Sequence, residues 1–175
     1  AGCGNVNNAL SFGGSNGSSL ATTEIWSGSS WTTTSNMNVA RYYLAGCGNV
    51  NNALSFGGSN GSNLSTTEAF SRTTPTFVDG WRTTSSMNVA RYGVAGCGNV
   101  NNALSFGGYN GSYLATTEIW SGSSWTTTSN MNVARSGVAG CGNTNNALSF
   151  GGSNGSYLST TEKWSGSSWA TTSAM

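Results

Sequence analysis

The sequence contains no histidine and few charged residues. Its 175 residues include six Lys and Arg and five Asp and Glu. Without histidine, the Ser-His-Asp and Cys-His nucleophile systems, histidine metal sites and the commonest general base are excluded. The five Asp and Glu residues also offer few candidates for a catalytic pair of carboxylates. The composition therefore predicts that the protein is not an enzyme.

The sequence also lacks the features that are typical of nucleic-acid-binding and membrane proteins. The formal net charge is only +1, so there is no basic footprint for nucleic acid or for an anionic membrane surface. No apolar run approaches the roughly 18 residues of a membrane span, and no stretch at Ala1 resembles a secretory signal. We therefore expect a soluble chain with neither a nucleic-acid nor a membrane partner; its cellular location is not indicated.

One ten-residue segment occurs four times in the chain, once with a substitution. ALSFGGSNGS begins at Ala9, at Ala53 and at Ala147, and it returns at Ala103 with Tyr109 in place of a serine. The cysteine spacing gives periods of 44, 50 and 44 residues. Periods of about 40 to 50 residues with several short strands are typical of propeller blades.

Each unit divides into four short runs bounded by Asn, Gly and Ser. They are a small apolar run such as Tyr92–Cys97, an apolar run closing on a diglycine (Ala9–Gly14), an alternating run (Thr22–Trp26) and a Trp-Thr run (Trp31–Thr34). These are strand signals, and no segment has a helical apolar period. The sequence predicts an all-β propeller of four-stranded antiparallel blades, innermost strand first. The single domain 1–175 would hold blades at about 1–37, 38–87, 88–131 and 132–175.

The diglycine after an apolar strand, an aromatic on the third strand and a later Trp resemble the kelch repeat of galactose-oxidase-type propellers. The matching residues are Gly13, Gly14, Trp26 and Trp31; Gly57, Gly58, Phe70 and Trp81; Gly107, Gly108, Trp120 and Trp125; and Gly151, Gly152, Trp164 and Trp169. The aromatic is usually Tyr in kelch repeats, whereas here it is Trp or Phe. The fuller signature is similar to repeats of marine bacteriophage and metagenomic proteins, which implies association with a virion or tail protein. The copper chemistry of galactose oxidase is not implied, because it needs histidines.

The four cysteines occupy one equivalent position per unit. Cys3, Cys47, Cys97 and Cys141 show no CxxC or Cys/His spacing. We expect four buried free thiols that act as small apolar fillers of the inner strand. A four-fold ring of thiolates around an axis that binds zinc is the alternative, but the prediction is no metal and no cofactor.

Ring closure leaves two architectures open. Four complete units need seven residues more than the chain has, and the missing stretch corresponds to NVARYYL at Asn38–Leu44. Either one chain forms a four-bladed ring, or two chains form an eight-bladed ring. An open half-ring exposes two apolar faces, and two-fold pairing is the commonest symmetry. We favour the eight-bladed homodimer, so that the first expected partner is the chain itself.

Two recurring sets of residues are expected to hold neighbouring blades together. A Glu and an Arg recur in the units, and we expect them to clamp neighbouring blades by charge-assisted hydrogen bonds. The deficit of seven residues removes one Arg, so one Glu should lack its partner. The pairs come from Glu24, Glu68, Glu118, Glu162, Arg41, Arg91 and Arg135. The aromatics expected between blades are Trp26, Trp31, Trp81, Trp120, Trp125, Trp164 and Trp169.

The loop after the diglycine varies while the strands hardly change. Its variable positions bring in Tyr109, Tyr113 and Tyr157, with Asn63 at the same place in the second unit. In propellers these loops share one face with the connections between blades, and Tyr offers an apolar body with a polar tip. The leading hypothesis is a non-enzymatic binding or structural module that recognises a glycan or a virion protein through this face. A passive scaffold without a ligand and an enzyme using Glu or Tyr in the central channel are the alternatives.

Overall fold

The computed structural model describes residues 1–72 and 79–175, and the elements in this part of the chain are strands. Blade 1 holds β1 (Gly2–Gly4), β2 (Ala9–Ser15), β3 (Ser19–Trp26) and β4 (Trp31–Thr34). Blade 2 holds β5 (Ala45–Gly48), β6 (Asn52–Phe56), β7 (Thr67–Ser71) and β8 (Gly80–Thr84). Blade 3 holds β9 (Ala95–Gly98), β10 (Ala103–Phe106), β11 (Thr117–Trp120) and β12 (Trp125–Thr128). Blade 4 holds β13 (Ala139–Gly142), β14 (Ala147–Phe150), β15 (Thr161–Trp164) and β16 (Trp169–Thr171).

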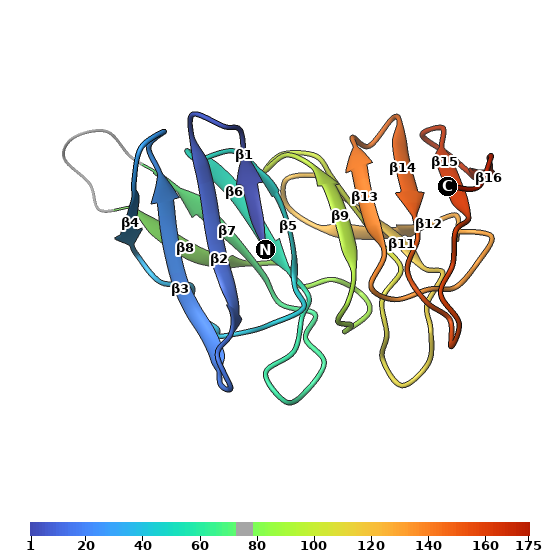
Figure 1. Cartoon of the computed structure of the whole chain (residues 1–175), viewed down its shortest axis with the longest axis horizontal. Coiled ribbons are helices and arrows are strands. Elements are labelled where there is room, and N and C mark those ends of the chain that lie inside the picture. Colours follow the sequence, from blue (N-terminus) through green and yellow to red (C-terminus); the bar gives the residue numbers. More distant parts are fainter. Residues whose placement is uncertain (73–78) are drawn as a thin grey trace.

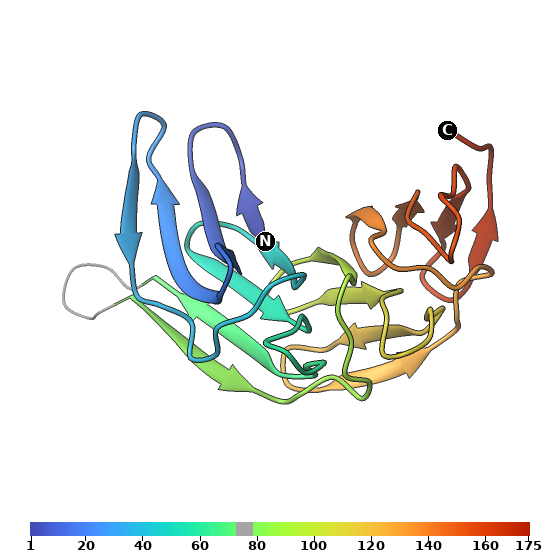
Figure 2. The ribbon, with the colours of Figure 1, turned by 60° about the horizontal axis from the view of Figure 1, so that its bottom comes forward.

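The four sheets are arranged as propeller blades. In each sheet the strands pair antiparallel in chain order. The first strands β1, β5, β9 and β13 are neighbours along the inside, where each contacts the next. Figure 2 shows the blades fanning out along an arc, with the first and the last blade at its two ends. The predicted all-β fold of four blades with four antiparallel strands each is confirmed.

Some predicted strand bounds need correction: β2 extends to Ser15, and β3 begins at Ser19 rather than at Thr22. The run Tyr92–Cys97 was expected to form an inner strand, but β9 begins only at Ala95. Tyr92 instead exchanges backbone hydrogen bonds with Tyr109, so the residues before Ala95 belong to the connector between blades. The second unit is longer than the others in the stretch RTTPTFVD at Arg72–Asp79, and residues 73–78 of this stretch lie outside the described residues.

The hydrophobic core lies between the blades rather than inside them. It forms three clusters, and each cluster joins residues of two consecutive blades. Phe12 of blade 1 packs against Trp81 of blade 2 with ring centroids 5.0 Å apart, and the indole N–H of Trp81 donates to Thr23 Oγ1 at 2.9 Å. The same contact recurs with Phe56, Trp125 and Thr67 and with Phe106, Trp169 and Thr117. Each seam therefore uses one copy of the same apolar and hydrogen-bonding geometry.

The inner strand must contain glycine for this contact to form. A Cβ added at Gly96 would overlap the tip of the Phe56 ring, and the same holds for Gly140 and Phe106. The second-strand Phe of one blade thus lies directly over the inner strand of the next. Substitution of such a glycine would push the two blades apart.

The connectors, which join consecutive blades, form buried ion pairs at the seams, where two blades pack together. Between blades 2 and 3, the guanidinium of Arg91 forms an ion pair with Glu118, and both side chains are fully buried. The carboxylate of Glu118 also accepts the backbone N–H groups of Asn88 at 2.6 Å and Val89 at 3.2 Å. Arg91 further donates to the carbonyl oxygens of Gly107 and Thr116. Arg41 with Glu68 and Arg135 with Glu162 repeat this arrangement.

This geometry predicts that the fully buried pairs are essential for stability. Substitution Glu118→Gln would leave the Arg91 guanidinium buried without a counter-charge, and such uncompensated charges cost about 3 kcal/mol or more. We expect the free energy of unfolding in urea, measured at fixed protein concentration, to fall by that amount.

Glu24→Gln is the matched control, because Glu24 holds the same place in blade 1 but is exposed. It should leave the unfolding midpoint unchanged. Equal destabilisation by both substitutions would contradict the clamp.

Candidate functional site

The connectors and the post-diglycine loops lie together on one side of the blades. Figure 1 shows the four loops that follow β2, β6, β10 and β14 along the lower edge of the molecule. Each connector joins the loop of the blade it enters: Tyr42 pairs with Ser59, Tyr92 with Tyr109 and Ser136 with Ser153. The connectors also bond to one another, because Gly93 N–H donates to the Tyr43 carbonyl and Gly137 N–H donates to the Gly93 carbonyl.

Five tyrosines form a continuous row on this side, hereafter the tyrosine row. Its members are Tyr42, Tyr43, Tyr92, Tyr109 and Tyr113. Consecutive ring centroids are 5.1 Å, 6.0 Å, 5.6 Å and 5.2 Å apart. The row begins in the connector that enters blade 2 and ends in the loop of blade 3. It therefore exists only because two connectors and one loop fold against each other.

Tyr43 has an unusual backbone conformation. Its φ is 52°, and it is the one non-glycine residue with positive φ in the described part of the chain. The equivalent residues in the next two connectors are glycines, Gly93 and Gly137, with φ of 61° and 62°. A side chain in the left-handed region costs roughly 1 kcal/mol or more. Tyr43 is nevertheless 65% exposed, so its ring is presented to solvent rather than buried.

A cavity of about 380 Å³ adjoins the row. It is lined by Tyr43, Tyr92, Gly93, Ser136 and Gly137, all of which belong to connectors. Two tyrosines, a serine and two glycines thus line this open space. Such a surface suits a ligand that combines apolar faces with hydroxyl groups.

The structure separates the loop residues chosen from sequence. Tyr109 and Tyr113 belong to the row, whereas Tyr157 is 99% exposed and Asn63 is half-buried and pairs with Ser59. Sequence reasoning missed Tyr42, Tyr43 and Tyr92. The expectation that connectors share a face with the loops was the signal that would have found them.

The two end blades expose opposite halves of a seam. At the open face of blade 1, Trp31 is 50% exposed, while its counterparts Trp81, Trp125 and Trp169 are buried. At the open face of blade 4, Leu148 is 38% exposed, although the equivalent Leu54 and Leu104 are fully buried. Phe150 and Thr161, which would receive a tryptophan, are only half-buried there. Blade 1 thus presents a tryptophan, and blade 4 presents its receiving surface.

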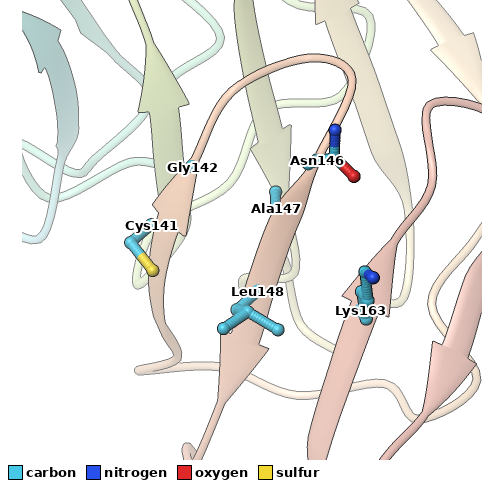
Figure 3. Close-up of a pocket in the computed structure, with 6 residues that line it drawn as sticks. All are labelled: Cys141, Gly142, Asn146, Ala147, Leu148 and Lys163. Atoms are coloured by element: carbon cyan, nitrogen blue, oxygen red, sulfur yellow. The ribbon is translucent and has the colours of Figure 1, made fainter.

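A second cavity, of about 420 Å³, lies on this face of blade 4. Cys141, Leu148 and Lys163 lie side by side on β13, β14 and β15, because they are register partners in the sheet (Figure 3). Lys163 stands where blades 1 and 3 have Ile25 and Ile119, so a cationic side chain replaces an apolar one at this position.

The cysteines correct one expectation. All four are free, but only Cys47 and Cys97 are buried; Cys3 is half-buried and Cys141 is exposed. Cys141 is exposed because no blade covers the face on which it lies. Burial raises the pKa of Cys3 to about 11 and that of Cys97 to about 12, and it also raises the pKa of Cys47. Within the described residues, no group of three or more His, Cys, Asp or Glu side chains is placed to hold a metal ion.

Comparisons with known proteins add no relative. A scan against protein-family models found no match to the chain, and a search of curated proteins found none. No helix among the described residues is long and apolar enough to cross a membrane.

The thiol environments predict selective alkylation. A raised pKa lowers the thiolate fraction at a given pH, and the thiolate is the reacting species. Cys47 and Cys97 of the native protein at pH 8 should stay unmodified by iodoacetamide during the time in which urea-unfolded chain is alkylated at all four cysteines. Mass spectrometry of tryptic peptides reports each site, and rapid native labelling of Cys97 would contradict the buried inner strand.

Proposed function

We propose that this chain is a non-catalytic β-propeller module that binds a carbohydrate through the tyrosine row. The observation that carries the proposal is Tyr43, which holds a bulky side chain in a conformation that the other connectors reserve for glycine. Strained residues that persist in a well-determined fold cluster at binding and catalytic sites. Tyrosine rings stack on the apolar faces of sugar rings, while their hydroxyl groups bond to sugar hydroxyls.

The use of the charged residues supports a non-catalytic role. Three of the four glutamates are buried in ion pairs with arginine, where their carboxylates also accept backbone N–H groups. These carboxylates are engaged in holding the blades. The sequence has no histidine to act as a base in their place.

We also propose that two copies close an eight-bladed ring. The half-exposed Trp31 of one copy and the receiving surface around Leu148, Phe150 and Thr161 of another repeat the pieces of the internal seams. Two such contacts would form at once in a two-fold pair. Closure would place two tyrosine rows on one face of the ring, so that a ligand with repeated sugars gains from both.

The kelch relationship and the virion association rest on the sequence signature of the repeats. They suggest surface glycans as the class of ligand. A protein partner on a virion is the second candidate, because exposed tyrosines are also enriched at protein interfaces.

The carbohydrate proposal predicts binding that depends on Tyr43. On a glycan array, the native protein should give signals above background, and Tyr43→Ala should reduce them by about tenfold or more, since a stacked ring is lost. Tyr157→Ala is the matched control, because Tyr157 lies outside the row, and it should keep the native signals.

An array without signal for the native protein would remove the carbohydrate proposal. Signals that Tyr43→Ala leaves unchanged would move the site away from the row. A passive scaffold predicts that neither substitution has any effect.

The ring proposal predicts twice the 17.9 kDa chain mass in solution. Light scattering should give this mass for the native protein and the single-chain mass for Leu148→Lys, because this substitution places a second ammonium group opposite Lys163 on a face that closure would bury. Tyr157→Ser changes a fully exposed loop side chain and should remain at twice the chain mass. A native protein at the single-chain mass over micromolar concentrations would overturn closure.

A further inference from the structure

Glu24 differs from its three counterparts. Glu68, Glu118 and Glu162 are fully buried, and each receives an arginine and two backbone N–H groups from the connector that enters its blade. Glu24 occupies the same register, opposite Ser11 and Thr33, but it is exposed. Blade 1 is the one blade that no connector of this sequence enters.

The space that a connector fills is open beside Gly14. A Cβ at Gly58, Gly108 or Gly152 would meet a connector carbonyl oxygen, that of Tyr42, Tyr92 or Ser136, at 2.8 to 3.0 Å. A Cβ at Gly14 would meet nothing within 4 Å. The rest of blade 1 keeps the strand pairing of the other blades, so this space persists in a folded blade.

The backbone edge beside this space is also unpaired. In blades 2 to 4 the loop residue after the diglycine bridges to the connector, as Ser59 does to Tyr42. Ser15 holds that place in blade 1 and pairs with Ser19, and no other segment among residues 1–72 and 79–175 pairs with it. The Glu24 carboxylate, the open space beside Gly14 and the unpaired edge at Ser15 therefore lie along the line that a connector follows in blades 2 to 4.

We propose that this line is a docking site for an extended segment of the connector sequence Asn-Val-Ala-Arg followed by an aromatic residue. The filled sites set the register. The N–H groups of Asn and Val donate to the Glu24 carboxylate, the Arg guanidinium forms an ion pair with it, and the next residue pairs with Ser15. The occupant is a further copy of the connector, such as one joined to another repeat.

Charge and backbone pairing together give the site its selectivity. A charge-assisted hydrogen bond from a guanidinium to a carboxylate is about twice as strong as a neutral one. Strand addition to a free edge supplies main-chain hydrogen bonds, and side-chain pockets supply the specificity. Glu24 lies on the open face of blade 1 that also carries Trp31, since Glu24 is opposite Thr33, two residues from Trp31. In the internal seams a connector and a neighbouring blade contact the equivalent face together, so the site is compatible with ring closure, and it shares no residue with the tyrosine row.

The test is a titration of a fluorescent peptide with the sequence Asn38–Leu44, NVARYYL, acetylated and amidated, against the whole chain. Fluorescence anisotropy should show saturable binding of one peptide per chain. The peptide with Ala in place of Arg should bind about tenfold more weakly or worse, since it loses the charged hydrogen bonds. Glu24→Gln in the protein should weaken the native peptide to a similar extent.

Two controls separate the site from other effects. Tyr157→Ser should bind the peptide as the native protein does, and Tyr43→Ala should do so as well, which distinguishes this site from the tyrosine row. The exposed position of Glu24 allows the Gln variant to fold, and an unchanged unfolding midpoint verifies this.

Absence of saturable binding would overturn the proposal. Binding that neither the Arg→Ala peptide nor Glu24→Gln weakens would overturn it too, because the peptide would then lie elsewhere.

Discussion

The seam between two blades is the contact on which the rest of the structure depends. A four-stranded blade has two apolar faces and buries neither of them alone, which is why all three core clusters join consecutive blades. Phe12, Trp81 and Thr23 form the first copy of a contact that the chain repeats at each seam. The glycines of the inner strand follow from the same contact, since the neighbouring Phe ring occupies the place of a side chain. The exposure of Trp31 and Leu148 at the two end faces is its direct consequence.

The connectors carry both the buried ion pairs and part of the proposed binding surface. Arg41 reaches into blade 2 to pair with buried Glu68, while the two residues that follow it, Tyr42 and Tyr43, begin the tyrosine row. The buried clamp holds the backbone of the connector in place. A rigid connector is what makes a positive φ at Tyr43 tolerable, and it keeps an exposed ring at a defined position. The buried ion pair thus holds in place the connector that carries the candidate site.

Scarcity of charge makes each charged group informative. With six basic and five acidic residues in the chain, three fully buried Arg–Glu pairs use a large part of the supply. Glu24 and Lys163 stand out because they occupy end faces, at positions where inner blades have a paired or an apolar residue.

The sequence by itself determined the all-β class, the four blades and the strand order, because the repeat period and the turn residues are local properties of the chain. It also indicated Tyr109 and Tyr113, whose variation is visible among otherwise constant repeats. Only the tertiary structure decided that Tyr42, Tyr43 and Tyr92 join them while Tyr157 does not, and that Cys141 is exposed while Cys97 is buried. These outcomes depend on which blade faces which and on where the arc ends. Equivalent positions in a repeat have the same local sequence but different neighbours in space, and the neighbours decide burial and contact.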